Sequence, residues 1–441
     1  MTKIAIIGTG YVGTVTAACL AWLGHDVTGL EVDERRVGQL RAGQLPFFEP
    51  GLAELLVEAM NTERLQFTSE PKVALSDADV VFLCVGTPLG EHGLPDLTQV
   101  EAAVESVARC IRDGAVLVNK STVPVGSGSW VRTLLEEAVP RETGPQVSVV
   151  SNPEFLREGS AVDDFLYPDR IVLGGDDGAP EKLAALYAPI LNQDFEGGRE
   201  GHKPQLIITD LPSAELIKYA ANAFLATKIS FANEVSNLCE LVGADARHVL
   251  PAIGADARIG PQFLQPGVGW GGSCFGKDVA AMIAMGQDYG LNATLLRATV
   301  EVNEGQKAAV VRKLQRELKI LKGRRIALLG LAFKPGTDDL RDAPSLGIAR
   351  RLLNRGALVS AFDPVVKDLP EDWPVRIGTD PYDAAERADA VVLVTEWPEF
   401  EDIDYAQLAK VMAGTLVLDG RNALDPSAAR AAGLRLIGTG W

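Results

Sequence analysis

The sequence predicts an α/β protein with two Rossmann-like, doubly wound parallel sheets joined by a long central helix. Apolar runs of strand length alternate with helical patterns through the first half, and the alternation returns after Arg325. Between them, residues 213–242 keep helical spacing without a break. We therefore expect a first Rossmann-like domain at 1–210, a helical connecting region at 211–320 and a second Rossmann-like domain at 321–441.

A glycine-rich turn follows the first predicted strand, residues 3–8, and opens an Ala-rich helix. Glycines at this spacing allow a tight turn and close approach of the backbone to a pyrophosphate. The next strand, residues 27–30, ends on Glu31, which can accept both ribose hydroxyls and would repel a 2′-phosphate. We therefore predict NAD in preference to NADP, although Arg35 and Arg36 lie nearby in the sequence. The predicted cofactor contacts of the turn are Gly8, Gly10, Tyr11, Val12 and Gly13.

Polar residues follow two further strands. Residues 79–85 lead to Thr87, and residues 115–119 lead to Ser121 and Thr122. In parallel sheets, ligands bind beyond the carboxyl ends of the strands. These hydroxyls are therefore candidate ribose, nicotinamide or water contacts, and ordinary turn chemistry at a strand end is the alternative.

Two acids, Glu154 and Glu158, follow the strand predicted at 147–150. If residues 155–158 are helical, the two carboxylates share one face, and a solvated acidic face is the alternative. Their position at the ligand-facing edge of the sheet favours a functional role. The insert LPFFEPG at 45–51 reads as a rigid loop, and its sequence indicates no role.

The long helix predicted at 213–242 carries Lys218 and Asn222 four residues apart on one face. Pro212 suits its first turn and Gly243 suits its end. A cation and an amide donor held together suit a developing oxyanion, and a lysine that snorkels to solvent is the alternative. Small residues on many sides of the helix favour close packing, so we expect it to connect the domains and to build a dimer.

A loop with six glycines, GPQFLQPGVGWGGSCFGKD, leads to Cys274 and then to a predicted helix. The positive end of a helix dipole and the adjacent Lys277 would both favour a thiolate. Together with Asp278, these residues form a candidate nucleophile site. A buried structural cysteine in a glycine loop is the alternative.

The second sheet repeats the pattern of the first but changes its turn. Residues 325–330 match the opening strand, and residues 356–363 match residues 24–31 in length and in ending on an acid. The turn after Gly330 lacks the third close glycine, so a base and anionic phosphates suit it better than a full dinucleotide. The residues it offers instead are Phe333, Lys334 and Arg341, and Arg421 follows a later strand.

Composition excludes several kinds of partner. A net charge of −17 argues against nucleic acid and anionic membranes. Five scattered cysteines are typical of reduced cytoplasmic thiols, and without CxxC or HExxH we predict no metal site. The chain enters a strand within three residues and has no long apolar run, so we expect a cytoplasmic protein without a signal peptide or membrane span.

A thiol has a specific use in a dehydrogenase. It can trap an aldehyde as a thiohemiacetal, which loses a second hydride to give a thioester that water cleaves. The combination of a dinucleotide site, a nucleotide site and a thiol loop therefore predicts four-electron oxidation of a primary alcohol to a carboxylate.

The chain resembles the UDP-glucose/GDP-mannose dehydrogenase family nearly from end to end. The motifs that carry the resemblance are GTGYVG, KSTVPVG, SNPEFLREGSAVDDF, ELIKYAANAFLATKISFANE, GGSCFGKD, FKPGTDD and DGRN. The resemblance implies NAD as cofactor, UDP-glucose as substrate and UDP-glucuronate as product. Gly276, Trp270 and Pro266 depart from the usual family residues beside the thiol and the sugar, and Glu31 replaces a more usual Asp.

The resemblance also implies roles for individual residues. Cys274 would be the nucleophile, Lys218 and Asn222 would stabilise oxyanions, Asp278 and Thr122 would hold the catalytic water, and Glu154 would assist proton transfer. The implied cofactor contacts add Thr87, Ser121, Thr122, Glu158, Lys277 and Arg341 to the glycine turn and Glu31. The implied substrate contacts are Glu154, Phe155, Leu156, Glu158, Lys218, Asn222, Arg258 (from its own or a neighbouring subunit), Phe263, Leu264, Gly267, Gly271, Phe275, Phe333, Lys334 and Arg421.

Three alternatives compete with oxidation of UDP-glucose. A GDP-mannose dehydrogenase is close, but AANAFLATKISFANE and Phe275 favour the UDP-glucose branch. A UDP-N-acetylmannosamine dehydrogenase would resemble GGHC before the thiol, where this chain has GGSC. A non-catalytic sensor of NAD and nucleotide sugars would need none of Cys274, Lys218, Asn222 and Asp278 as a set.

Overall fold

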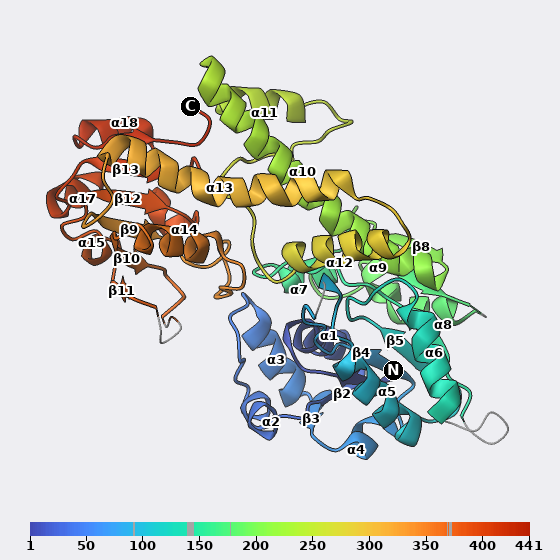
Figure 1. Ribbon diagram of the computed structural model, residues 1–441. Helices are drawn as coiled ribbons and strands as arrows, with labels where there is room; N and C mark the ends of the chain where they lie inside the picture. The colour runs from blue at the N-terminus through green and yellow to red at the C-terminus, as the bar shows by residue number, and fades with distance from the viewer. Residues whose placement is uncertain (91–92, 139–144, 177, 368, 370–372) are drawn as a thin grey trace. The chain divides into compact units, whose positions relative to one another are not determined.

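The computed structural model describes residues 1–90, 93–138, 145–176, 178–367, 369 and 373–441. The chain divides into two compact units, Met1–Ala220 and Ala221–Trp441. The boundary falls inside the long helix α10 (Leu211–Val242), which belongs to both (Figure 1). Pro212 lies in its first turn and Gly243, at φ 75°, follows its end, as predicted.

The first unit is built on an eight-stranded sheet in the order β3-β2-β1-β4-β5-β6-β7-β8. Neighbouring strands are parallel except β6 and β7, which pair antiparallel. The order 3-2-1-4-5-6 is that of a doubly wound dinucleotide-binding sheet, so the predicted fold is confirmed for this unit. The strands are β1 (Lys3–Ile7), β2 (Asp26–Leu30), β3 (Leu65–Thr68), β4 (Val80–Leu83), β5 (Val116–Asn119), β6 (Ser148–Ser151), β7 (Arg170–Gly175) and β8 (Gln205–Thr209).

Helices cover both faces of this sheet. Alternate residues of β1 belong to different apolar clusters, Ile4 and Ile6 to one and Ala5 and Ile7 to the other. A strand buried on both faces reads as the continuous apolar run seen in the sequence. The helices are α1 (Tyr11–Trp22), α2 (Glu34–Arg41), α3 (Leu52–Asn61), α4 (Pro71–Leu75), α5 (Thr98–Cys110), α6 (Ser127–Ala138), α7 (Ala161–Leu166), α8 (Ala179–Leu186) and α9 (Ala188–Asn192).

The second unit holds a six-stranded parallel sheet in the order β11-β10-β9-β12-β13-β14, drawn in orange and red in Figure 1. This is again the order 3-2-1-4-5-6, so the predicted repetition of the fold is confirmed. The strands are β9 (Arg325–Leu329), β10 (Leu358–Phe362), β11 (Val375–Ile377), β12 (Ala390–Leu393), β13 (Leu416–Asp419) and β14 (Arg435–Ile437). The helices are α11 (Ala246–Gly254), α12 (Phe275–Asp288), α13 (Thr294–Leu318), α14 (Pro344–Leu353), α15 (Pro381–Ala384), α16 (Pro398–Glu401), α17 (Tyr405–Val411) and α18 (Pro426–Ala431).

The two sheets use the acid after their second strand in the same way. Glu31 accepts hydrogen bonds from Thr9 N and Asp33 N, and Asp363 accepts them from Leu331 N and Val365 N. Each carboxylate therefore ties the turn after the first strand to the end of the second. Among the helices that the structure describes, none combines the length and apolar character needed to cross a membrane.

Candidate active site

The glycine turn of the first unit has the shape of a dinucleotide cradle. Gly8 has a φ of 89°, and a Cβ on Gly13 would lie 1.9 Å from the carbonyl oxygen of Gly8. By contrast, a Cβ on Gly10 would meet no atom within 4 Å apart from its neighbours along the chain. Protein packing thus explains Gly8 and Gly13, whereas the open space beside Gly10 fits a ligand that approaches the backbone at the start of α1. These residues fit the pyrophosphate of NAD.

Glu31 is buried at the end of β2. Its Oε2 accepts from Thr9 Oγ1 at 2.9 Å and from Arg36 Nη1 at 3.2 Å. Burial acts to raise the pKa of Glu31, but hydrogen bonds from Asp33 and Thr9 and the charge of Arg36 outweigh burial and lower the pKa. The carboxylate is therefore held in its charged form, the form that accepts hydroxyl donors.

Two of the three predicted strand-end hydroxyls, those of Thr87 and Ser121, donate to main-chain carbonyls. Thr87 Oγ1 donates to Thr122 O at 2.8 Å, and Ser121 Oγ donates to Val85 O at 2.8 Å. The hydroxyl protons of Thr87 and Ser121 are therefore used in hydrogen bonds within the strand-end turns, which was the alternative considered from the sequence. The two loops are fixed together, and Ser121 and Thr122 line one pocket with Lys218.

The condition under which Glu154 and Glu158 would share a face, a helix at residues 155–158, is not met. The stretch that follows β6 has no regular secondary structure up to Arg157 and then turns, and a helix begins only at Ala161. Leu156 N donates to the Glu154 carboxylate, and Arg157 N donates to Asp164 Oδ2. Since side chains satisfy these two N–H groups, Glu154 and Glu158 do not share a helical face.

Glu154 instead forms a buried ion pair with Lys218. Lys218 Nζ lies 2.7 Å from Glu154 Oε1, and both side chains are buried. Burial acts to raise the pKa of Glu154, but the charge and hydrogen bond of Lys218 prevail and lower it. Phe155 lies between two cations, with the Arg170 guanidinium 3.9 Å and Lys218 Nζ 5.5 Å from its ring centroid.

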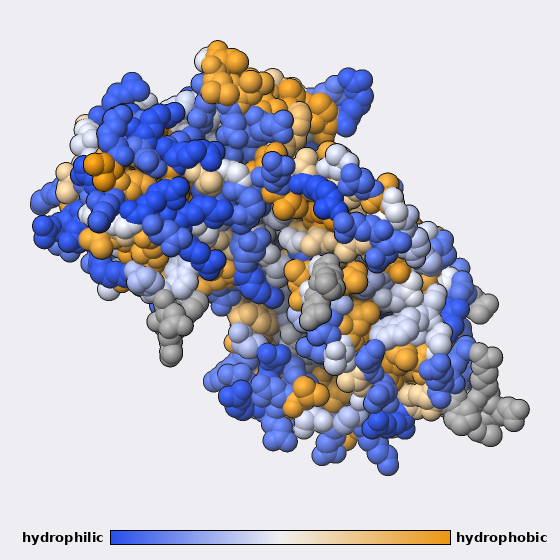
Figure 2. All heavy atoms as spheres, viewed as in Figure 1, coloured by the Kyte–Doolittle hydropathy of each residue, from blue (hydrophilic) through white to orange (hydrophobic). Residues whose placement is uncertain are grey.

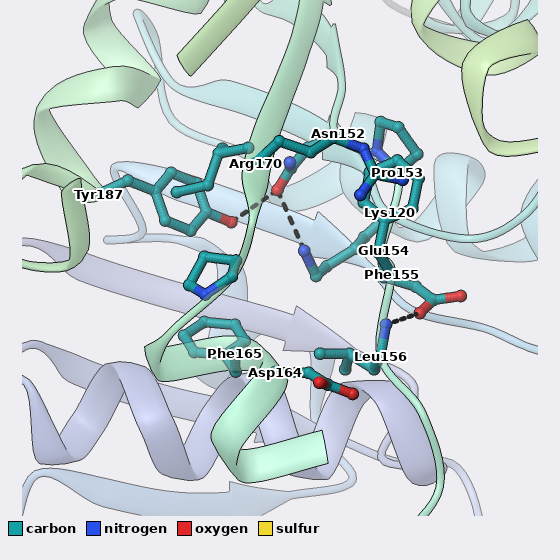
Figure 3. Close-up of a pocket in the computed structure, with 12 residues that line it drawn as sticks. Lys120, Asn152, Pro153, Glu154, Phe155, Leu156, Asp164, Phe165, Arg170 and Tyr187 are labelled. Carbon is teal, nitrogen blue, oxygen red and sulfur yellow. Dashed lines mark hydrogen bonds between the residues drawn. The ribbon is translucent and has the colours of Figure 1, made fainter. Parts of the chain in front are cut away.

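Lys120 is a buried amine that the sequence interpretation did not assign. Figure 3 shows Lys120 and Tyr187 both reaching the side-chain oxygen of Asn152, at 3.2 Å and 2.6 Å. Burial lowers the pKa of Lys120, the charge of Glu154 acts to raise it and that of Lys218 to lower it further. Lys120 directly follows the end of β5 and is the first residue of the motif KSTVPVG. That position at a strand end was the sequence signal that could have identified it.

Glu215 is a second buried group that sequence reasoning missed. Its two carboxylate oxygens accept from Gly126 N and Gly128 N, each at 2.7 Å, and it lines the pocket that holds Thr122 and Lys218. A Cβ on Gly128 would lie 3.0 Å from Glu215 Oε1. Glu215 therefore fastens α10 to the start of α6, one turn of helix away from Lys218.

We expect Glu215 to make stability fall as the pH rises towards neutrality. Burial raises its pKa from 4.5 to about 7, against the lowering effect of the two main-chain N–H groups. Because the folded pKa exceeds the unfolded one, the stabilisation is complete below the unfolded pKa and is lost as the pH rises through about 7. The free energy of unfolding of wild type should fall by up to about 3 kcal/mol, relative to Glu215→Gln, between pH 4.5 and 8. Denaturant unfolding of both proteins across this pH range measures the difference. If the free energies of unfolding of wild type and Glu215→Gln changed in parallel with pH, the prediction would be wrong.

In the second unit, Cys274 takes the N-cap position of α12, as the sequence predicts. Its Sγ lies 3.6 Å from Ser273 Oγ. One turn into the helix, the buried Asp278 accepts from Asn222 Nδ2 at 2.6 Å and from Lys277 Nζ at 2.9 Å. The structure therefore brings Asn222 of α10 together with Lys277 and Asp278 of α12, the helix that Cys274 begins, in one polar cluster around the buried Asp278.

The glycine loop before Cys274 packs against the carboxyl ends of the second sheet. A Cβ on Gly267 would lie 3.0 Å from the guanidinium of Arg421, and one on Gly272 would lie 2.7 Å from the ring of Phe333. Arg421 also donates to Val394 O and pairs with Glu396. At these two glycine positions a side chain would collide with its neighbours, and the loop brings together three regions predicted for substrate binding, namely the loop itself, Phe333 and Arg421. A Cβ on Gly271 would lie 2.3 Å from the main-chain oxygen of Asp342.

Other predicted substrate residues differ in their surroundings. The Leu264 side chain is buried in a core with Ala232 and Leu250, so its role beside the loop is packing. Phe263, at φ 62°, places its ring 6.4 Å from that of Phe275. Arg258 pairs with Asp256 and is 89% exposed.

The turn after β9 differs from the dinucleotide turn as expected. The next helix, α14, does not begin until Pro344. The intervening loop carries Lys334, 5.6 Å from the Phe333 ring centroid, and Arg341, which pairs with Asp339. The departure at Trp270 also has a reason, because its ring is buried and its Nε1 donates to Ser230.

No group of three or more His, Cys, Asp or Glu residues in the described ranges is arranged to hold a metal ion. Two doubly wound sheets, a dinucleotide cradle and a helix-capping thiol define the class of nucleotide-dependent dehydrogenases.

Comparison with known proteins identifies the family within that class. The models of the UDP-glucose/GDP-mannose dehydrogenase family match this chain in three parts: the NAD binding domain at residues 2–191, the central domain at 212–305 and the UDP binding domain at 327–426. The chain belongs to the UDP-glucose/GDP-mannose dehydrogenase family and is an oxidoreductase.

Similar proteins support the same assignment. A UDP-glucose 6-dehydrogenase of Pseudomonas aeruginosa is 44% identical, covering 96% of this chain and 94% of its own. One from Bacillus subtilis is 42% identical, covering 98% of this chain and 92% of its own. The solved structure of a UDP-glucose dehydrogenase from Pyrobaculum islandicum is 39% identical, with a TM-score of 0.89, and covers 100% of this chain and 98% of its own. The family resemblance predicted from the motifs is confirmed.

Proposed function

We propose that this chain oxidises UDP-glucose to UDP-glucuronate with two molecules of NAD. The observation that carries the proposal is the similarity to UDP-glucose 6-dehydrogenases over nearly the whole length, at 42–44% identity. The residues of the thiol loop and of the ion pair supply the chemistry. NAD, when bound, accepts a hydride in each of the two oxidations.

Each group has a proposed task in this reaction. Cys274 Sγ attacks the C6 aldehyde formed by the first oxidation, and Lys218 and Asn222 hold the resulting oxyanion. The second oxidation leaves a thioester on Cys274. Water held by Asp278 and Thr122 then attacks the thioester carbon, the C–S bond breaks, and Glu154 assists proton transfer. One water is consumed, two cofactors are reduced, and the thiol returns as the carboxylate leaves.

The remaining predicted contacts keep their proposed tasks. We place the cofactor against Gly8 to Gly13, Glu31, Thr87, Ser121, Glu158, Lys277 and Arg341. We place the UDP-sugar against Phe333, Lys334, Arg421 and the loop from Phe263 to Gly271, because an aromatic ring and two cations suit a uracil base and a diphosphate. The three-part division at residues 210 and 320 is proposed to match cofactor binding, catalysis and UDP binding.

A substrate panel tests this function. Purified protein with NAD would be offered UDP-glucose, GDP-mannose and UDP-N-acetylmannosamine, and NADH would be counted per sugar nucleotide. We expect two NADH per UDP-glucose and an acid product. Turnover confined to another sugar would favour one of the alternative dehydrogenases, and binding without NADH would favour a sensor.

We expect a strong preference for NAD over NADP. The Glu31 carboxylate would lie beside a 2′-phosphate and repel it. Arg36 would not compensate for this repulsion, because its guanidinium is already paired with Glu31. Glu31→Ser would release Arg36 and should shift the ratio of kcat/KM values towards NADP by about tenfold or more. The matched control is Arg35→Ala, because Arg35 is 93% exposed. Equal kcat/KM for both cofactors in wild type would contradict the assignment.

We also propose a dimer built on α10. Phe224, Phe231 and Leu238 recur every seven residues on this helix and are more than half exposed. Figure 2 shows hydrophobic atoms gathered over the end of α10 and α11, where Leu241 and Val242 are also exposed. Apolar rows of this kind on a helix mark interaction surfaces.

Light scattering of single variants tests the dimer. We expect wild type to have at least twice the mass of the chain and Phe231→Glu to approach the mass of one chain. Val73→Glu, on α4 and equally exposed, is the control and should leave the mass unchanged. A fully active wild-type monomer would rule the dimer out.

A further inference from the structure

The loop of residues 45–51 gains a role from one buried carboxylate. Glu49 is 4% exposed, while the residues on either side of it, Phe48 and Pro50, are exposed. A carboxylate almost never lies buried unless its oxygens are hydrogen-bonded or paired with charge. The partners of Glu49 therefore indicate what the loop holds.

Those partners come from two distant segments of the first unit. Glu49 Oε2 accepts from the hydroxyl of Tyr11, in the dinucleotide turn, and from Gly159 N at 2.6 Å. Glu49 Oε1 accepts from Ala161 N at 2.7 Å. One side chain thus joins the glycine turn to the segment that follows Glu154 and Glu158.

Packing on either side of Glu49 fixes the position of the loop and of Tyr11. The ring of Phe47 lies 4.8 Å from the ring of Tyr11, centroid to centroid, so the loop holds both ends of the tyrosine. Gly51, at φ 75°, then starts α3, which packs against α1. Burial, the hydrogen bond to Glu49 and the charges of Glu49 and Glu158 all raise the pKa of Tyr11, which keeps its hydroxyl a donor.

We propose that Glu49 is a positioning residue that couples cofactor binding at the Gly8–Gly13 turn to the placement of Glu154 and Glu158. The turn approaches the cofactor through its backbone, and Tyr11 is the point at which the turn is attached to Glu49. A cofactor that orders the turn thereby orders the segment from Gly159 to Ala161, and the reverse holds by linkage. The inference rests on the proposed function, because it assigns Glu154 to the chemistry.

The test uses Glu49→Gln, Tyr11→Phe and the double variant in the full-length protein. Glu49→Gln turns one acceptor into an amide donor that faces a main-chain N–H. Tyr11→Phe removes only a hydroxyl and leaves the carboxylate on Gly159 and Ala161, so it remains informative if Glu49→Gln folds poorly. The control is Glu54→Gln, an exposed carboxylate on α3.

We expect the Kd for NAD, measured by calorimetry without turnover, to rise about tenfold in Glu49→Gln and in Tyr11→Phe. The kcat should fall, the KM for UDP-glucose should stay within about twofold, and the double variant should be no worse than Glu49→Gln, since both changes break one link. Glu54→Gln should match wild type.

Three results would overturn the coupling. These are an unchanged Kd for NAD with only a lower Tm, additive effects in the double variant, and an increase confined to the KM for UDP-glucose. Failure of the proposed function would look different, because wild type itself would then reduce no NAD with UDP-glucose.

Discussion

Cys274→Ser should bind UDP-glucose nearly normally and yet turn over at least about 10³-fold more slowly than wild type. The first oxidation does not require the thiol, so it should still proceed. Serine can form a hemiacetal and an ester, but an oxygen ester transfers its acyl group to water less readily than a thioester. The variant should therefore stop as a covalent adduct or release free aldehyde.

Two measurements check this result. Intact-protein mass spectrometry after addition of UDP-glucose and NAD should show the adduct, and wild type should give two NADH per UDP-glucose without detectable aldehyde. Cys110→Ser is the matched control, because Cys110 is half-buried like Cys274 but ends α5. Burial raises the pKa of Cys84 to about 12, so that thiol is a poor nucleophile. Wild-type turnover and stoichiometry in Cys274→Ser would refute the thioester mechanism.

Lys218→Ala should lower kcat by roughly 10²–10³-fold and change the KM for UDP-glucose far less. The ammonium is proposed to stabilise charge that develops in the transition state, so its loss should lower kcat rather than weaken substrate binding. If kcat survives and only KM rises, Lys218 is a binding residue.

The buried ion pair complicates this measurement and also supplies its control. Lys218→Ala leaves Glu154 as a buried carboxylate without its cation, which typically costs about 3–5 kcal/mol of stability. Adding Glu154→Gln removes that charge and should restore Tm. Because Glu154 is itself proposed to assist proton transfer, the reference for kcat is Glu154→Gln alone, and the double variant should turn over more slowly than that single variant. Equal kcat in the double variant and in Glu154→Gln, at a restored Tm, would show that the rate loss of Lys218→Ala came from unfolding. Lys228→Ala, on the same helix, should leave kcat unchanged.

The fold class followed from the sequence because it depends on local periodicity. Continuous apolar runs predict strands buried on both faces, and both sheets have such strands, for example β1 in the first and β12 in the second. The glycine turn and the N-terminal position of Cys274 on α12 also depend on short segments, whose backbone requirements appear directly as residue types.

The pairing of charged groups was decided only by the tertiary structure. Lys218 meets Glu154 across 64 positions, Asn222 meets Asp278 across 56, and Glu49 meets Ala161 across 112. No periodicity encodes such contacts, since they arise when separately formed elements pack and each buried polar group must find a partner.

The same requirement explains why residues 155–158 do not form the helix that would have put Glu154 and Glu158 on one face. Residues 155–158 could have been helical, but the carboxylates of Glu154 and Asp164 take the N–H groups of Leu156 and Arg157. The sequence by itself determined which elements form and which residue types the chemistry needs. Packing determined the partner of each buried carboxylate, because a buried charge is stable only where the folded chain places hydrogen-bond donors or a cation beside it.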